Sequence, residues 1–210
     1  MVTIGRGTGT PGFSFDNEQP AAERWLAPFE IDSAPVSAGE VLAFVEDGGY
    51  WRSEFWPGDA QAWHAALRPA HPERWRKQQA GWEMRWFDRW LPLDPAMPAI
   101  QLNAFEAEAY CHWAGRRLPC AAEWEVAAAH PGFRWGGSVW EPTADAFTPY
   151  FGFAPGPYAD YSAPWFGNHR ELRGGAFATH ARLHDRRYRN FFTPDRCDVF
   201  SGFRTAAVQS

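Results

Sequence analysis

Helix signals in this chain all lie before residue 130, and their placement limits the possible folds more than any other feature. The clearest helix begins at Asn103, where Glu106 completes the spacing of a capping box and Gly115 suits the C-terminal cap. A second capping box predicts a helix over about residues 37–47, and the propensities of residues 121–128 predict a third. Any fold must therefore place three short helices among much irregular backbone.

The remaining segments are rich in Gly, Pro and aromatic residues. The first thirty residues predict strands and turns. Residues 50–97 are dense in Trp and interrupted by Pro, so we expect loop with short helices there. Three short strands are expected nearer the C-terminus, at residues 138–141, 171–175 and 202–205. Long aromatic and Arg-rich loops join these strands, and loops of that length favour a functional role.

Composition and charge exclude several classes of protein. A chain of 210 residues without an evident linker or repeat predicts one domain over residues 1–210. A net charge of -5 excludes a nucleic-acid partner on electrostatic grounds, and an aromatic content of 17% favours aromatic-lined pockets. With neither an apolar stretch of the roughly 20 residues that span a bilayer nor the order of a signal peptide, we expect no membrane partner and a cytoplasmic protein.

The cysteines fit neither a disulfide framework nor a structural zinc site. They are three in number and lack the CxxC spacing, at Cys111, Cys120 and Cys197. We interpret them as free thiols in a reducing compartment. A buried structural role is favoured over a catalytic one for each of them.

One long signature covers residues 103–119 and continues through residues 122–128. Three further motifs follow it, at residues 137–141, residues 172–177 and the terminal Gly202–Phe203–Arg204. Together, and in this order, they resemble the sulfatase-modifying-factor family, which includes the formylglycine-generating enzymes, and the resemblance spans nearly the whole chain. It implies an α+β fold related to C-type lectins, rich in loops, with a small twisted antiparallel sheet and a few helices.

Within this family the chain is similar to the branch that forms the C-terminal half of ergothioneine- and selenoneine-type sulfoxide synthases. The similarity is carried by residues 15–18, 43–50 and 188–196. The formylglycine-generating enzymes hold copper with two cysteines shortly after the Gly-Gly strand, and here Thr179 and His184 occupy the matching stretch. The resemblance therefore implies that this copper chemistry is lost.

The resemblance also implies a reaction and the partners that it needs. Sulfoxide synthases use non-haem iron and oxygen to join a thiol or selenol donor to a trimethylated histidine. Their iron is held by three histidines of a separate helical-bundle domain, which nothing in this chain resembles. We therefore expect iron(II) only with a partner domain that lies on another chain or is missing from this sequence. No metal ligand is expected within this chain, except that calcium, known in parts of the family, could bind side chains such as Asp145 and Asn168.

Two groups of residues are candidates for the site. Tyr158 matches a loop tyrosine that acts as the proton donor in this branch, and Tyr161 matches a second tyrosine near the substrate. Trp165 and Phe166 would complete an aromatic wall. In the second group, polar residues flank an apolar pair, and its arginines would bind the carboxylate of an amino-acid-like donor. This group comprises Arg187, Arg189, Asn190, Phe191, Phe192, Asp195 and Arg196. Some relatives carry Trp-Asp in place of Phe191–Phe192, which leaves the identity of the donor open.

Purely structural roles are the alternatives to these assignments. The tyrosines could merely fix a Pro-rich loop, and the arginines could brace surface loops through ordinary ion pairs. His180 and His184 have a spacing that would suit a metal on a helix, but the family predicts strand and loop there. Pro142 cannot donate a backbone hydrogen bond, so we expect the strand around it to end early. A non-catalytic, lectin-like binding module with an aromatic pocket is the alternative function.

Overall fold

The computed structural model describes residues 1–209 and contains short helices and small antiparallel sheets joined by long loops. The α-helices are α1 (Ala38–Glu46), α2 (Asp59–Leu67), α3 (Ala104–Trp113) and α4 (Ala121–Ala127). The strands are β1 (Val2–Ile4), β2 (Ala22–Arg24), β3 (Trp75–Gln78), β4 (Gly81–Trp86), β5 (Arg89–Pro92), β6 (Arg116–Arg117), β7 (Trp140–Ala146), β8 (Arg170–Gly174), β9 (Asn190–Phe192) and β10 (Ala206–Ala207). This mixture confirms the predicted α+β class.

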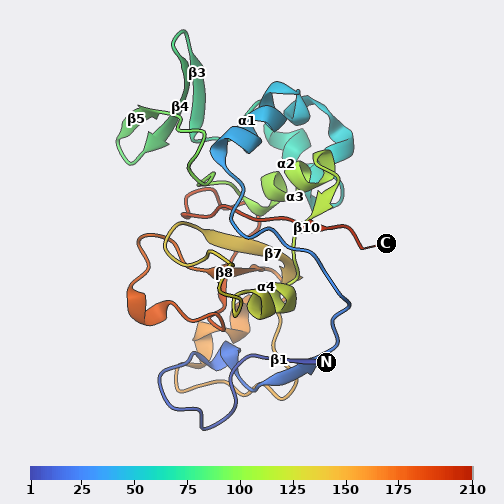
Figure 1. Ribbon diagram of the computed structural model, residues 1–210, viewed down its shortest axis with the longest axis vertical. Helices are drawn as coiled ribbons and strands as arrows, with labels where there is room; N and C mark the ends of the chain where they lie inside the picture. Colours follow the sequence, from blue (N-terminus) through green and yellow to red (C-terminus); the bar gives the residue numbers. More distant parts are fainter. Residues whose placement is uncertain (210) are drawn as a thin grey trace.

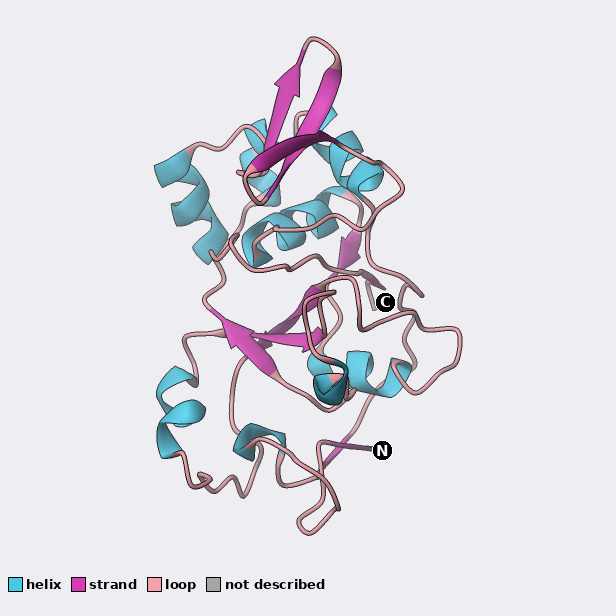
Figure 2. Cartoon of the chain, turned by 90° about the vertical axis from the view of Figure 1, so that its left-hand side faces the viewer, coloured by secondary structure: helices cyan, strands magenta, loops and turns pink. Residues whose placement is uncertain are grey.

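The sheets occupy different levels of an elongated molecule. One three-stranded sheet has the order β3-β4-β5, the other has the order β7-β8-β9, and β1 pairs with β2 and β6 with β10. Figure 1 shows α1, α2 and α3 beside the β3–β5 sheet at one end, β7 and β8 in the middle, and β1 at the other end. In the view of Figure 2 the β3–β5 sheet projects beyond the helices. No helix among residues 1–209 has the length and hydropathy needed to cross a membrane.

The three predicted helices are confirmed, and hydrogen bonds explain where two of them begin. Ser37 caps α1, since its Oγ accepts from the Glu40 amide at 3.3 Å while Glu40 accepts from the Ser37 amide at 2.8 Å. The Asn103 and Glu106 side chains cap α3 in the same reciprocal way, with both distances 2.9 Å. Gly115 follows α3 with φ of 64°, a conformation that favours glycine.

The prediction for residues 50–97 was wrong in one respect, because this segment holds the whole β3–β5 sheet in addition to α2. The pairing of Met84 with Leu91 places both on the face that carries Trp86, whereas Arg85 and Trp90 share the opposite face. The alternation is only six residues long in β4 and is crowded by charges and Trp. A period of two over so short a run does not separate a strand from a loop.

Two strand predictions also need correction. β7 does not end at Pro142 but continues to Ala146, with Pro142 paired to Leu172. Because β7 is an outer strand of its sheet, a residue without an N–H group is tolerated there. Residues 202–205 do not form a strand, and β10 begins only at Ala206.

Residues 202–205 are nevertheless buried, and the side chain of Arg204 explains why. Its guanidinium is fully buried and pairs with Glu141, donating to Oε1 at 2.7 Å and also to Oε2. It lies over the Phe133 ring at 3.7 Å. The same Glu141 accepts a hydrogen bond from the indole of Trp124 at 2.8 Å. Ion pairing and packing therefore help to fix this segment. Backbone hydrogen bonds add to them, since the Phe203 and Thr205 carbonyls accept from the Val36 and Asp32 amides at 2.8 and 3.0 Å.

Candidate functional site

The loop that carries the predicted tyrosines, residues 156–166, is fixed to the N-terminal part of the chain. We call it the tyrosine loop. Within it Ser162 is fully buried, and its hydroxyl donates to Asp16 Oδ1 and accepts from Asn17 Nδ2 at 3.0 Å. The Gly156 amide donates to Asp16 Oδ2 at 3.2 Å. In Figure 1 the loop, in orange, and the blue N-terminal segment lie at the same end of the molecule.

Tyr161 occupies the centre of a cluster of aromatic rings. Its ring stacks on Phe15, with centroids 4.4 Å apart and an interplanar angle of 11°, and meets Phe191 edge-on at 5.7 Å. Burial, and after it the neighbouring Tyr188 hydroxyl, raises the pKa of the Tyr161 phenol well above its ordinary value. Tyr158 lies beside it, with centroids 6.4 Å apart, and 68% of Tyr158 is exposed. The two predicted tyrosines are thus neighbours in different environments.

A second wall of rings continues the cluster from β9. Phe191 stacks on Phe147 at 4.2 Å, and Phe166 packs on the same ring at 4.8 Å. His169 lies 5.9 Å from Phe191 and 5.1 Å from Trp165, which is 41% exposed. Partial burial, and then the charge of Arg196, lowers the pKa of His169 and favours its neutral form. We call the set Phe15, Phe147, Tyr158, Tyr161, Trp165, Phe166, His169 and Phe191 the aromatic cluster.

Arg189 does not lie on an open surface as a carboxylate ligand would. Only 1% of it is exposed, and its guanidinium pairs with Glu171 at 2.6 Å and donates to the Thr148 carbonyl at 2.7 Å. It also lies over the Tyr150 ring at 4.1 Å. These contacts show how Arg189 fastens β9 to β8 and to the loop after β7. Its Nε is buried without a partner in the described part of the chain.

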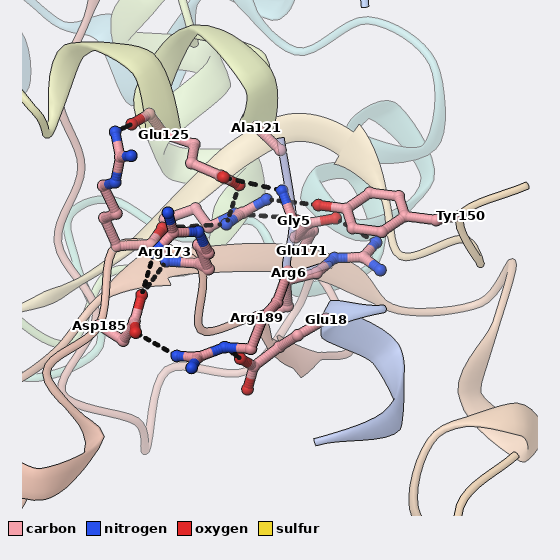
Figure 3. A network of polar contacts seen from close by, with 12 residues as sticks. Gly5, Arg6, Glu18, Ala121, Glu125, Tyr150, Glu171, Arg173, Asp185 and Arg189 are labelled. Carbon is pink, nitrogen blue, oxygen red and sulfur yellow. Dashed lines mark hydrogen bonds and ion pairs between the residues drawn. The ribbon is translucent and has the colours of Figure 1, made fainter. Parts of the chain in front are cut away.

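Arg189 belongs to a larger buried network, shown in Figure 3. Arg173 is at its centre and donates to Glu171 at 2.7 Å, to Glu125 at 3.0 Å and to the Tyr150 hydroxyl at 3.0 Å. Burial would raise the pKa of Glu171, but the charges of Arg189 and Arg173 outweigh it and lower that pKa. The carboxylate is therefore held in its charged form.

The same network reaches the N-terminal segment. The Gly5 amide donates to Glu125 at 2.8 Å, and Arg6 pairs with Asp185 and lies 3.7 Å from the carboxylate of Glu18. Burial is the largest influence on Glu18 and raises its pKa. The N-terminal segment that holds the tyrosine loop is itself held by Glu125 of α4 and by Asp185, through a buried hydrogen bond and an ion pair (Figure 3).

The remaining predicted residues are scattered. Arg196 is exposed and pairs with Asp198 at 2.9 Å, with its guanidinium 5.3 Å from the Phe192 ring. Arg187 is half-buried beside Asp185 at 3.8 Å. The side chain of Asn190 accepts from the amide of the next residue at 2.9 Å, within β9.

Asp195 faces a separate cavity of about 540 Å³, whose other acidic walls are Glu73 and Glu106. The structure therefore brings together the first group of candidates and one member of the second, namely Tyr158, Tyr161, Trp165, Phe166 and Phe191. The other members of the second group do not lie together.

The described acids, histidines and cysteines do not fit a metal centre. Within residues 1–209 no three of these side chains are arranged to hold an ion. Thr179 accepts a hydrogen bond from the Ala176 amide at 3.0 Å, and His180 accepts one from the Arg182 amide at 3.2 Å. The Asp145 carboxylate accepts from the Ala121 amide at 2.5 Å. Each of these groups is engaged in local backbone contacts.

Comparison with known proteins decides the family. The family model described as the sulfatase-modifying factor enzyme 1-like domain matches residues 1–136. The chain belongs to this family. PvdO from Pseudomonas aeruginosa shares the fold, with a TM-score of 0.65 at 18% identity, over 98% of this chain and 90% of PvdO.

Among the relatives of this sulfatase-modifying-factor domain are two kinds of enzyme. A hercynine oxygenase of Mycobacterium tuberculosis is 31% identical over 240 residues, which cover 92% of this chain and 56% of the relative. A formylglycine-generating enzyme of Streptomyces coelicolor is 26% identical over 263 residues, which cover 93% of this chain and 83% of the relative. The chain spans only about half the length of the hercynine oxygenases that it matches.

Sequence reasoning missed several residues of the site. Phe15, Asp16 and Tyr188 lie within two of the strings that resemble the synthase branch, so that resemblance could have found them. Ser162 and Phe147 carry no signal in the sequence. Their roles follow from contacts between segments more than 140 residues apart in one case and about 45 in the other.

Proposed function

We propose that this domain binds substrate and supplies a proton in an oxygen-dependent synthase of ergothioneine or selenoneine type. Its substrates would be a trimethylated histidine and a thiol or selenol donor. The observation that carries the proposal is the meeting of Tyr158, Tyr161 and Phe191 in one aromatic cluster, in which Tyr158 is exposed and the other two rings are half-buried. The kinship with hercynine oxygenases over 92% of the chain supports it.

The chemistry of the rings suits this role. Aromatic rings attract quaternary ammonium groups. Tyr161 lies beside the exposed Tyr158 and meets Phe191 edge-on, so these rings offer such a group an aromatic surface. The raised pKa of Tyr161 keeps its phenol protonated. Tyr158 is the ring open to solvent and so the one that can deliver a proton to a bound substrate. In this proposal Tyr161 binds the trimethylammonium group of the substrate, and Tyr158 donates the proton.

A partner must supply the metal in this proposal. The described residues form no metal centre, and the hercynine oxygenases are nearly twice as long as the part that matches this chain. We propose that an iron-binding helical-bundle domain, on a separate polypeptide or on a part of the protein outside this sequence, completes the site. That domain would supply the redox chemistry with oxygen, while this chain orients the substrate and holds the proton at Tyr158 Oη.

Reconstitution tests the proposal. The purified chain would be mixed with the iron-binding domain of a hercynine oxygenase, iron(II), oxygen, the trimethylated histidine and each candidate donor. We expect oxygen-dependent product only when both proteins are present, and a loss of about 100-fold or more in Tyr158→Phe. Tyr110→Phe is the control, because Tyr110 is buried among the helices, away from the aromatic cluster. Turnover by this chain alone, or full activity of Tyr158→Phe, would refute the division of labour.

A further inference from the structure

The carboxylate of Asp16 contacts the tyrosine loop at two points. One oxygen accepts from the Ser162 hydroxyl and the other accepts from the Gly156 amide at 3.2 Å. These donors stand at the two ends of the stretch 156–162, which contains Tyr158 and Tyr161. A single side chain therefore spans the loop segment that presents both tyrosines.

The residues on either side of Asp16 strengthen this contact. Asn17 is fully buried and donates its amide to the Ser162 hydroxyl at 3.0 Å, while the Phe15 ring stacks on Tyr161 at 4.4 Å. Three consecutive residues thus contact the same loop. Asp16 accepts from the Gly156 amide, Asn17 donates to the Ser162 hydroxyl, and Phe15 stacks on the Tyr161 ring. Each contact joins positions about 140 residues apart or more, so local sequence cannot impose this arrangement.

The segment that carries Asp16 is rigidly held from behind. The Arg6 amide donates to the Glu18 carbonyl at 2.7 Å, and the Phe15 amide donates to the Glu18 carboxylate at 3.1 Å. Arg189 of the buried network donates to the Asn17 carbonyl. Groups fixed in this way place a functional loop more accurately than the loop places itself.

We propose that Asp16 is a positioning residue that sets the placement of Tyr158 and Tyr161. It acts by holding the tyrosine loop through Ser162 and Gly156, and it touches no substrate itself. The consequence of this positioning for substrate binding rests on the proposed function. The effect of Asp16 on the placement of the two tyrosines is independent of that function.

Fluorine NMR tests the placement directly. The chain has six tyrosines, so labelling with 3-fluorotyrosine gives six signals that Tyr→Phe variants assign. In Asp16→Asn at least one of the two hydrogen bonds is lost, because an amide presents one acceptor oxygen where the carboxylate presents two. We expect the Tyr158 and Tyr161 signals to shift or broaden while those of Tyr50 and Tyr110 stay in place.

Two further variants make this test decisive. Ser162→Ala removes the hydroxyl and with it the hydrogen bonds to Asp16 and from Asn17, and it should change the same two signals. Asp160→Asn is the matched control, since Asp160 lies in the same loop, is exposed, and its side chain has no hydrogen-bond partner within residues 1–209. Unchanged Tyr158 and Tyr161 signals in Asp16→Asn, or equal changes in Asp160→Asn, would overturn the inference. If Asp16→Asn does not fold, Ser162→Ala decides by the same criteria.

Calorimetric titration with the trimethylated histidine separates this inference from the proposed function. We expect Asp16→Asn to bind at least ~10-fold more weakly than the wild type, which corresponds to about 1.4 kcal/mol. Equal affinities of Asp16→Asn and wild type would contradict the positioning role. If the wild type itself does not bind the ligand, the proposed function fails, and the NMR signals alone decide whether Asp16 positions the tyrosines.

Discussion

Replacing Arg189 with Met should destabilise the domain strongly, although a simple view of the sequence makes this arginine a surface ligand. The side chain is 1% exposed, so the substitution leaves the buried carboxylate of Glu171 with Arg173 as its one remaining cation. It also removes the hydrogen-bond donor of the Asn17 and Thr148 carbonyls. Removing one partner of a buried ion pair costs about 3–5 kcal/mol. For a chain of this size each kcal/mol lowers the Tm by roughly 2–4 °C. The expected fall is therefore roughly 6–20 °C.

Arg196→Met is the matched control, because Arg196 and Asp198 are about half exposed. Exposed ion pairs contribute about 0–1 kcal/mol, so the Tm of this variant should fall by no more than ~4 °C. Differential scanning calorimetry at neutral pH measures both values. If the two variants lose equal stability, Arg189 is not held in a buried network and the account of how the N-terminal segment is fixed is wrong.

Acid titration extends the same prediction. The pKa of Glu171 is lowered in the fold by Arg189 and Arg173, which outweigh its burial. Its carboxylate therefore stabilises the fold above the unfolded pKa near 4, and that stability is lost as the pH falls through the lower folded value. Removing Arg189 raises the folded pKa. Acid unfolding of Arg189→Met should then begin at a higher pH than that of the wild type.

Three other predictions concern the core. Burial raises the pKa of Glu106 to about 7, so the wild type should lose stability as the pH rises from about 4 to about 7. The Tm of Glu106→Gln should fall less than that of the wild type across this range. Equal falls in the two proteins would contradict this prediction. A Cβ on Gly49 would lie 1.9 Å from the Phe44 ring, so urea unfolding should show Gly49→Ala to be less stable by about 1–3 kcal/mol, whereas Gly7→Ala, with its nearest contact at 3.4 Å, should be nearly neutral. Burial raises the pKa of all three cysteine thiols, to about 11 for Cys120 and about 12 for Cys197, so a thiol reagent at pH 8 should modify the native protein far more slowly than the unfolded chain.

The helices could be predicted from the sequence because their signals are local. A capping box such as that of Asn103 and Glu106 needs four consecutive residues, and the structure forms it as expected. The β3–β5 sheet could not be predicted, since its strands are short and its stabilising contacts cross between them. Pro142 shows the same limit, because its tolerance depends on being in an outer strand, which only the assembled sheet reveals.

The candidate site divides in a similar way. Aromatic residues of one loop, such as Tyr158 and Tyr161, could be predicted together because they are adjacent in the sequence. The arginines could not be assigned, since a guanidinium in a buried network and one on the surface look alike in a sequence, as Arg189 and Arg196 do. Asp16 was missed as a site residue because its partners lie about 140 positions away.

The most direct measurement of whether the aromatic cluster is a substrate site is calorimetric titration of the purified chain with a trimethylated histidine. We predict saturable binding that is lost in Tyr161→Ala and kept in Tyr110→Phe, whose ring lies among the helices. Binding that survives Tyr161→Ala, or preference for a glycan or peptide over the trimethylammonium ligand, would contradict it.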